Sequence, residues 1–153
     1  MCYVLTIKDH FSKYLWLRPI SEKKSELVAA ELRNLFYEIG FPLIFHTDNG
    51  TEFIAKTVFD LLKRDPLVFS VTGRVRTPTD QGSVERSNQD IRKGISKCIL
   101  QGHQNGEVLT WVDVLSKVAN GLNNSSTKKN ISSGNVCLVP SQMHFCSISI
   151  TIA

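Results

Sequence analysis

Two acidic residues lie at positions where catalytic sites are often found. The first is Asp48. It follows the apolar run Leu43 to Phe45 and precedes Asn49-Gly50, a dipeptide that favours positive φ and a chain reversal. Asp48 therefore falls at the carboxyl end of an expected buried strand, where open α/β sheets usually bind their ligands. The alternative is that Asp48 only shapes the turn.

Glu85 is the second acidic residue. It lies in the first turn of an expected helix, where the helix dipole favours the ionised carboxylate. Ionised oxygens suit Mg²⁺, which takes one or two carboxylates together with waters and substrate phosphate oxygens. The pair of Asp48 and Glu85 is therefore suggestive of a metal site, although a glutamate in a first turn is also ordinary helix chemistry.

Strand-like and helix-like segments alternate before Asp48. Tyr3–Ile7 and Tyr14–Pro19 are rich in β-branched and aromatic residues and predict an antiparallel hairpin. Apolar residues at helical spacing predict a helix over Glu22–Ile39, with Ser21 as its cap and Gly40 as its stop.

The alternation continues after Asp48. Thr51 is expected to cap a helix, and the buried side of that helix would carry Phe53, Val58, Leu61 and Leu62. A short apolar run over Leu67–Val71 predicts another strand. Because sheet and helix segments alternate, the predicted fold class is α/β.

Two long amphipathic helices are expected in the second half of the chain. A loop over Thr72–Gly82 precedes the first of them, which begins at Ser83 and contains Gly94, a residue that weakens a helix by up to about 1 kcal/mol relative to Ala. The second begins near Trp111. Residues 126–153 show no clear period, so we expect one domain over residues 1–125 and a poorly specified tail over 126–153.

Composition narrows the class of protein. The chain has 153 residues, of which 42% are hydrophobic and 21% charged, as in soluble globular domains. Its net charge of +4 permits a polyanionic partner without requiring one. There is no apolar run long enough for a membrane span and no signal-peptide pattern, so an intracellular location, nuclear or cytoplasmic, is expected. The four cysteines lack metal-site spacing and are interpreted as structural thiols.

Four segments of the sequence resemble one known family. HTDNGTEF, followed by TPTDQGSVERSN, resembles the retroviral and long-terminal-repeat retrotransposon integrase catalytic core, which has a ribonuclease-H-like fold. The spacing between Asp48 and Glu85 is one residue longer than in the family pattern. IKDHFSKYLWLRPI and WVDVLSKVANGLNNS are also similar to family segments, so the resemblance extends from about residue 3 to residue 125.

The resemblance implies a chemistry for the two acids. In the family, two aspartates and one glutamate hold two Mg²⁺ or Mn²⁺ ions for hydrolysis and strand transfer at a phosphodiester. Two such cations can stabilise both the attacking and the leaving oxygen of an in-line displacement. By resemblance, Asp48 is the second aspartate and Glu85 is the glutamate.

The resemblance also implies a set of residues that contact DNA. Gln81 falls in the family's flexible loop, and Asn88 and Arg92 fall on the helix face that the family turns toward DNA. Arg86 and Lys93 lie nearby, either as further phosphate contacts or as solvated residues.

By the same resemblance, Asp9 does not complete the catalytic set, and we expect its carboxylate to lie away from that of Asp48. In the family, the first catalytic aspartate lies on the first, central strand, whereas the motif resembled by DHFSKY ends the second strand. The separation of Asp9 from Asp48 fits the second strand and is too short for the first. The resemblance therefore puts the first strand and its aspartate upstream of Met1. We expect the sheet to be only marginally stable without that strand, or its two inner edges to pair directly.

Three functional hypotheses follow. The leading one is an integrase core fragment of retroelement origin, with DNA as its partner, a homodimer through its first and last helices, and incomplete catalysis. The second is a domesticated DNA-binding or oligomerisation module without catalysis. The third is an unselected fragment.

Overall fold

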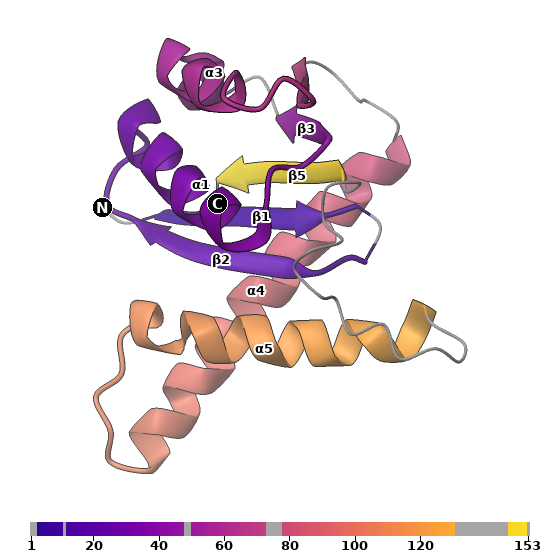
Figure 1. Ribbon diagram of the computed structural model, residues 1–153. Helices are drawn as coiled ribbons and strands as arrows, with labels where there is room; N and C mark the ends of the chain where they lie inside the picture. Colours follow the sequence, from indigo (N-terminus) through magenta and orange to yellow (C-terminus); the bar gives the residue numbers. More distant parts are fainter. Residues whose placement is uncertain (1–2, 11, 48–49, 73–77, 131–146, 153) are drawn as a thin grey trace. The chain divides into compact units, whose positions relative to one another are not determined.

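The computed structural model describes residues 3–10, 12–47, 50–72, 78–130 and 147–152 (Figure 1). The chain forms two compact units, one of residues 1–74 and 132–153 and the other of residues 75–131. In the described ranges, no helix is long and apolar enough to cross a membrane.

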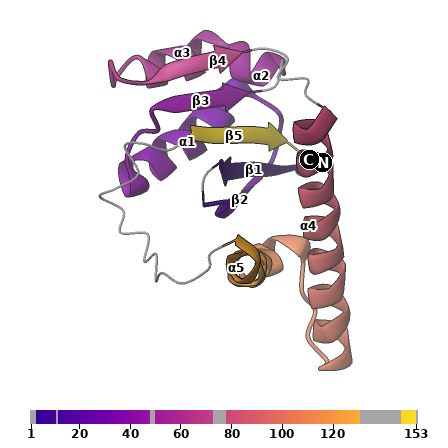
Figure 2. The ribbon, with the colours of Figure 1, turned by 90° about the vertical axis from the view of Figure 1, so that its right-hand side faces the viewer.

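One mixed sheet forms the first unit, in the strand order β2-β1-β5-β3-β4 (Figure 2). β1 pairs antiparallel with β2 and β5, whereas β3 pairs parallel with β4 and β5. The α/β class, the amino-terminal hairpin and the mixed sheet with flanking helices are therefore confirmed. The strands are β1 (Tyr3–Asp9), β2 (Leu15–Ile20), β3 (Ile44–Thr47), β4 (Phe69–Thr72) and β5 (Ser147–Ile152).

The centre of the sheet is formed by a segment far from its neighbours in sequence. β5 lies between β1 and β3, with Ile150 opposite both Ile7 and Thr47. The expectation that the two inner edges would pair directly is therefore wrong. β5 has the sequence SISITI, in which hydroxyl residues alternate with isoleucine, and this period of two suits a strand with one buried face. This alternation covers only six residues, and the rest of residues 126–153 shows no clear period. The sequence analysis therefore did not predict a strand there.

Helix α1 (Ser25–Ile39) begins later than the predicted Glu22. Lys24 precedes the helix in extended backbone without a side-chain cap, so Ser21 is not the cap. The predicted stop is confirmed, because Gly40 has a φ of 91° and its N–H donates to the carbonyl of Phe36 at 2.9 Å.

The helix expected after Asp48 is divided into α2 (Thr51–Ile54) and α3 (Lys56–Leu62). Ala55, between them, is extended at φ −65° and ψ 148°. Gly50 precedes α2, so Thr51 is the first helical residue and the predicted cap is wrong. The predicted buried side is confirmed, with all four apolar residues buried: Phe53, Val58, Leu61 and Leu62.

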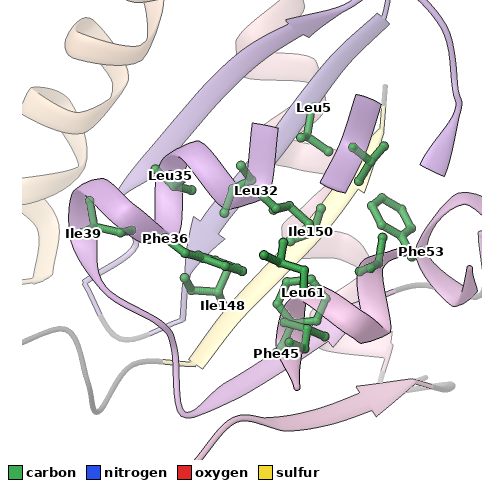
Figure 3. Packing of buried hydrophobic residues seen from close by; sticks show 14 of the residues in the cluster. Leu5, Leu32, Leu35, Phe36, Ile39, Phe45, Phe53, Leu61, Ile148 and Ile150 are labelled. Carbon is green, nitrogen blue, oxygen red and sulfur yellow. The ribbon is translucent and has the colours of Figure 1, made fainter. Parts of the chain in front are cut away.

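The core of the first unit lies between the sheet and helices α1 to α3 (Figure 3). Phe36 of α1 is at its centre, with its ring centroid 5.1 Å from that of Phe41 and 6.0 Å from that of Phe45. Ile148 and Ile150 of β5 are 2% and 1% exposed. Burying a side chain of this size contributes about 1.5–3 kcal/mol, so β5 is part of the core as well as of the sheet.

Helices α4 (Pro78–Gln104) and α5 (Trp111–Asn130) form the second unit. α4 begins at Pro78, so the prediction of a loop over residues 78–82 is wrong. Proline is well tolerated in a first turn because its missing N–H has no helical partner there. Residues 73–77 of the expected loop lie outside the described residues. Both helices are amphipathic as predicted, because Ile91 of α4 and Leu115 and Val118 of α5 are buried; Val114, which was not expected on the apolar side, is buried as well.

Two hydrogen bonds that the sequence analysis did not use join Thr110, just before α5, to Asp113 in its first turn. Oδ2 of Asp113 accepts hydrogen bonds from the backbone N–H of Thr110 at 2.8 Å and from its hydroxyl at 2.5 Å. These two bonds hold the pKa of Asp113 below its usual range. Their contribution to stability is therefore present above the unfolded-state pKa and is lost as the pH falls through the lowered folded-state pKa.

Gly94 marks a close contact between α4 and α5. A Cβ atom added to Gly94 would lie 2.8 Å from Cγ1 of Val118. The same atom on Gly121 of α5 would meet nothing within 4 Å. The glycine expected to weaken α4 therefore also allows the two helices to approach each other.

We expect Gly94→Leu to lower the free energy of unfolding by about 1–3 kcal/mol, because the new side chain overpacks the contact with Val118. Gly121→Leu is the control, and its improved helix propensity should raise stability by up to about 1 kcal/mol. Urea unfolding followed by circular dichroism measures both. Equal effects of the two substitutions would show that α4 and α5 do not meet at Gly94.

Candidate active site and nucleic-acid face

The strand predicted before Asp48 and the helix predicted after it are both observed. β3 ends at Thr47 and α2 begins at Thr51, and Asp48 and Asn49 between them lie outside the described residues. Thr47 is 6% exposed, and its Oγ1 has no hydrogen-bond partner among the described residues. The residue before Asp48 thus brings a buried hydroxyl to this end of the sheet.

The central strand adds no acid to the same end. Thr47 pairs with Ile150, so Thr151 is the next residue of β5 in the direction in which Asp48 follows β3. The strand contains only Ser, Thr and Ile. In the described part of the chain, no group of three His, Cys, Asp or Glu residues could hold a metal ion. Sequence reasoning missed the place of β5 beside the candidate site, and its six-residue alternation was the available signal.

Asp9 has a local role in the β1–β2 hairpin. It is 1% exposed, and its Oδ2 accepts hydrogen bonds from the backbone N–H and from the hydroxyl of Ser12, both at 2.6 Å. On the sheet it stands opposite Ile148, two residues along β5 from the Thr47–Ile150 pair. We expected the Asp9 carboxylate to lie away from that of Asp48. Asp48 lies outside the described residues, so this stays a prediction. The observed contacts are those of a turn.

Removing the Asp9 carboxylate should destabilise this turn. We expect Asp9→Ala to lower the free energy of unfolding by about 1–3 kcal/mol, because the partly buried N–H of Ser12 loses its acceptor. Asp65→Ala is a matched control, since Asp65 accepts one hydrogen bond from the N–H of Leu67 at 3.0 Å in an exposed turn. Thermal unfolding should be measured with and without Mg²⁺. Stabilisation by Mg²⁺ that Asp9→Ala abolishes would identify Asp9 as a metal ligand and contradict the turn assignment.

Helix α4 carries the other candidate residues. Gln81, Glu85, Asn88 and Arg92 recur at spacings of three or four, which places their positions on one face of the helix. The structure describes the backbone of Gln81 and Glu85 without their side chains. Asn88 is half-buried, and its Oδ1 has no hydrogen-bond partner among the described residues. Arg92 is exposed.

Arg86 and Lys93 lie beside this face. They are seven residues apart, so they share one side of α4, and both are exposed. The ion pairs of Arg18 with Glu38 and of Lys24 with Glu22 both lie in the first unit. Among the described side chains, no ion pair is seen for Arg86, Arg92 or Lys93, so within that part of the chain their charges are available to an anionic partner.

Comparison with known proteins adds a family and a set of relatives. A family model described as the integrase core domain matches residues 1–78. A putative transposon-derived protein of Caenorhabditis elegans is 31% identical over 125 residues, which are 80% of this chain and 41% of that protein. KRAB-A domain-containing protein 2 of Homo sapiens is 30% identical over 101 residues, which are 66% of this chain and 20% of that protein. The chain thus spans less than half of each of these relatives.

Solved structures show the same fold. The catalytic core domain of BIV integrase superposes with a TM-score of 0.63 at 21% identity, covering 93% of this chain and 85% of that one. The HTLV-2 integrase catalytic core in complex with magnesium, in its dimeric form, superposes with a TM-score of 0.63 at 21% identity, covering 93% and 83%. These likenesses confirm the predicted ribonuclease-H-like arrangement of a mixed sheet with flanking helices.

Proposed function

Because this chain belongs to the integrase core domain family and is of retroelement origin, we propose that it binds DNA but does not cut or join it. Asp48 and Glu85 are the proposed metal ligands. Mg²⁺ held by these carboxylates would supply charge stabilisation at a phosphodiester. By the resemblance, Asp48 and Glu85 match two of the family's three acids.

One observation carries the proposal of incomplete catalysis. β5 lies beside β3 at the end where Asp48 follows, and its residues are hydroxyl and aliphatic. Two cations and a scissile phosphate need several anionic ligands, whereas a neutral hydroxyl is a weaker ligand for Mg²⁺ than a carboxylate. A site built from Asp48, Glu85 and neutral side chains is therefore short of charge for a second cation.

DNA binding rests on different residues. Arg86, Arg92 and Lys93 are exposed on one helix, and none of them depends on a metal to neutralise phosphate. Asn88, with a buried oxygen that lacks a partner among the described residues, and Gln81 are proposed as polar contacts on the same helix. A homodimer through α1 and α5 is also proposed, supported by the dimeric form of the HTLV-2 core.

A second candidate is a host-encoded module that keeps DNA binding or oligomerisation as its selected role. It is favoured by the similarity to human KRAB-A domain-containing protein 2. Like the leading proposal, a host-encoded module would lack catalysis. It would also require a stable fold and a reproducible affinity for DNA. An unselected fragment requires neither property.

A nicking assay on labelled duplex DNA tests the catalytic part of the proposal. We expect no cleavage or strand transfer with Mg²⁺ or Mn²⁺, because the second cation lacks a ligand. Glu85→Gln is the control variant. Metal-dependent cleavage by the unchanged chain that disappears in Glu85→Gln would show a working site and overturn the proposal.

A binding titration at several salt concentrations tests the DNA part. Each phosphate contact contributes about −0.9 to the slope of log K against log salt, so replacing Arg86, Arg92 and Lys93 with Ala should flatten the slope by about 2 to 3. The matched control replaces three exposed cations of the first unit with Ala: Arg33, Lys56 and Lys63. Binding that does not depend on salt, or equal losses in the two triple variants, would contradict an interface on α4.

A further inference from the structure

β5 joins two half-sheets that do not otherwise pair. β2 and β1 form one half, β3 and β4 form the other, and both inner edges bond to β5 (Figure 2). We call the space between the inner edges of β1 (Tyr3–Asp9) and β3 (Ile44–Thr47) the central slot. Ser147 comes 100 residues after Thr47, so the slot is bounded by residues distant in sequence from its occupant.

The central slot specifies both the direction and the pattern of its occupant. Its two edges require a strand that is antiparallel to β1 and parallel to β3. Its floor is apolar at the centre, where Leu5, Ile7 and Phe45 are 0% exposed, while the buried polar residues Asp9 and Thr47 stand opposite Ile148 and Ile150 on the same face. An occupant must therefore place β-branched or other apolar side chains on every second residue.

β5 satisfies these requirements within its own six residues. Ile148 and Ile150 pack into the core (Figure 3). Ser149 and Thr151 alternate with them, so they lie on the opposite face, where both are half-buried. A slip of one residue would turn the hydroxyls into the core, so the alternation fixes the register. The direction, register and buried side chains of β5 are all local to the segment, and none of them depends on its covalent connection.

We propose that the central slot is a strand-acceptor site, and that Ser147–Ile152 of a second copy of the chain can fill it in place of the chain's own segment. Both segments have the same sequence and offer the same backbone groups. The covalent connection favours the chain's own segment, because it makes pairing within one chain an intramolecular event. Exchange between copies should therefore appear when the chain's own strand is disabled or when the chain folds at high concentration.

The first test supplies the strand as a peptide to a full-length chain whose own strand is disabled. The acceptor is Ile150→Asp, and the probe is a synthetic peptide of residues 147–152 flanked by lysines for solubility. Saturating peptide should restore the circular dichroism spectrum and thermal transition of the unchanged chain. The control peptide has the same composition with its isoleucines grouped together, and it should bind at least tenfold more weakly because it cannot alternate.

If the Ile150→Asp chain does not respond to the peptide, whether that chain is folded or not, the result counts against the proposal. Equal binding of the two peptides would count against it as well.

The second test uses the unchanged chain, unfolded in denaturant and refolded at increasing concentration. The fraction of dimer measured by light scattering should rise with concentration and fall when the peptide is present during refolding. A chain that refolds only as a monomer at every concentration and takes up no labelled peptide would overturn the acceptor site.

Discussion

Ile150→Asp is expected to abolish the cooperative unfolding transition of the first unit. Ile150 is 1% exposed and lies between Ile7 and Thr47 at the centre of the sheet. A buried carboxylate without a partner costs several kcal/mol, and the apolar contacts of the isoleucine are lost as well. Because a whole domain is stable by only about 5–15 kcal/mol, this one change removes much or all of the margin. Thermal and urea unfolding followed by circular dichroism measure it.

The control is Ser149→Asp on the same strand. Ser149 is half-buried on the opposite face and stands directly opposite Lys8 of β1. An opposite charge across a strand pair contributes about 0.2–1 kcal/mol, so this variant should retain the unfolding transition. If Ile150→Asp unfolded like the unchanged chain, or if the two variants were equally damaged, β5 would not have Ile150 in the core.

Phe36→Ala should lower the free energy of unfolding by about 3–5 kcal/mol, the range for removing a buried aromatic ring. Phe36 is 1% exposed and packs against Phe41 and Phe45, so its removal leaves a cavity between α1 and the sheet. The measurement is equilibrium unfolding in urea, with the slope checked for a change in the surface exposed.

The next residue along the helix provides the comparison for Phe36. Tyr37 is 64% exposed, and its hydroxyl accepts a hydrogen bond from Nη1 of Arg64 at 2.8 Å. Tyr37→Ala should therefore change stability by no more than about 1 kcal/mol. A larger loss for Tyr37 than for Phe36 would show that α1 presents a different face to the sheet.

Much of the fold could be predicted because its signals are local. β-branched and aromatic composition identified the hairpin, and apolar residues at helical spacing identified α1. The apolar residues expected on the helix after Asp48 are buried in α2 and α3, and the positive φ of Gly40 ended α1 as expected. Helix starts were less accurate, because Lys24 and Gly50 precede their helices without a side-chain cap. Helix starts are predicted from residues whose side chains can cap the first turn, and here that rule selected Ser21 and Thr51.

The place of β5 could not be predicted because it depends on partners distant in sequence. Its six residues could form a strand in many positions of a sheet. They lie at the centre of this sheet because they pair with the inner edges of β1 and β3. The candidate site depended on motifs rather than on packing. Asp48 and Glu85 therefore stay predictions, whereas Asp9 is seen in the hairpin turn that its position in DHFSKY implied.

The central position of β5 also sets when the first unit can fold during synthesis. At about 5–20 residues per second, a ribosome needs roughly 5 to 20 s to proceed from Thr47 to Ser147. Throughout that interval β1 and β3 have no partner on their inner edges, and such edges can pair with other chains. The sheet can close only after β5 has been synthesised. We expect this folding step to be slow, because it joins residues as distant as Leu5 and Ile152.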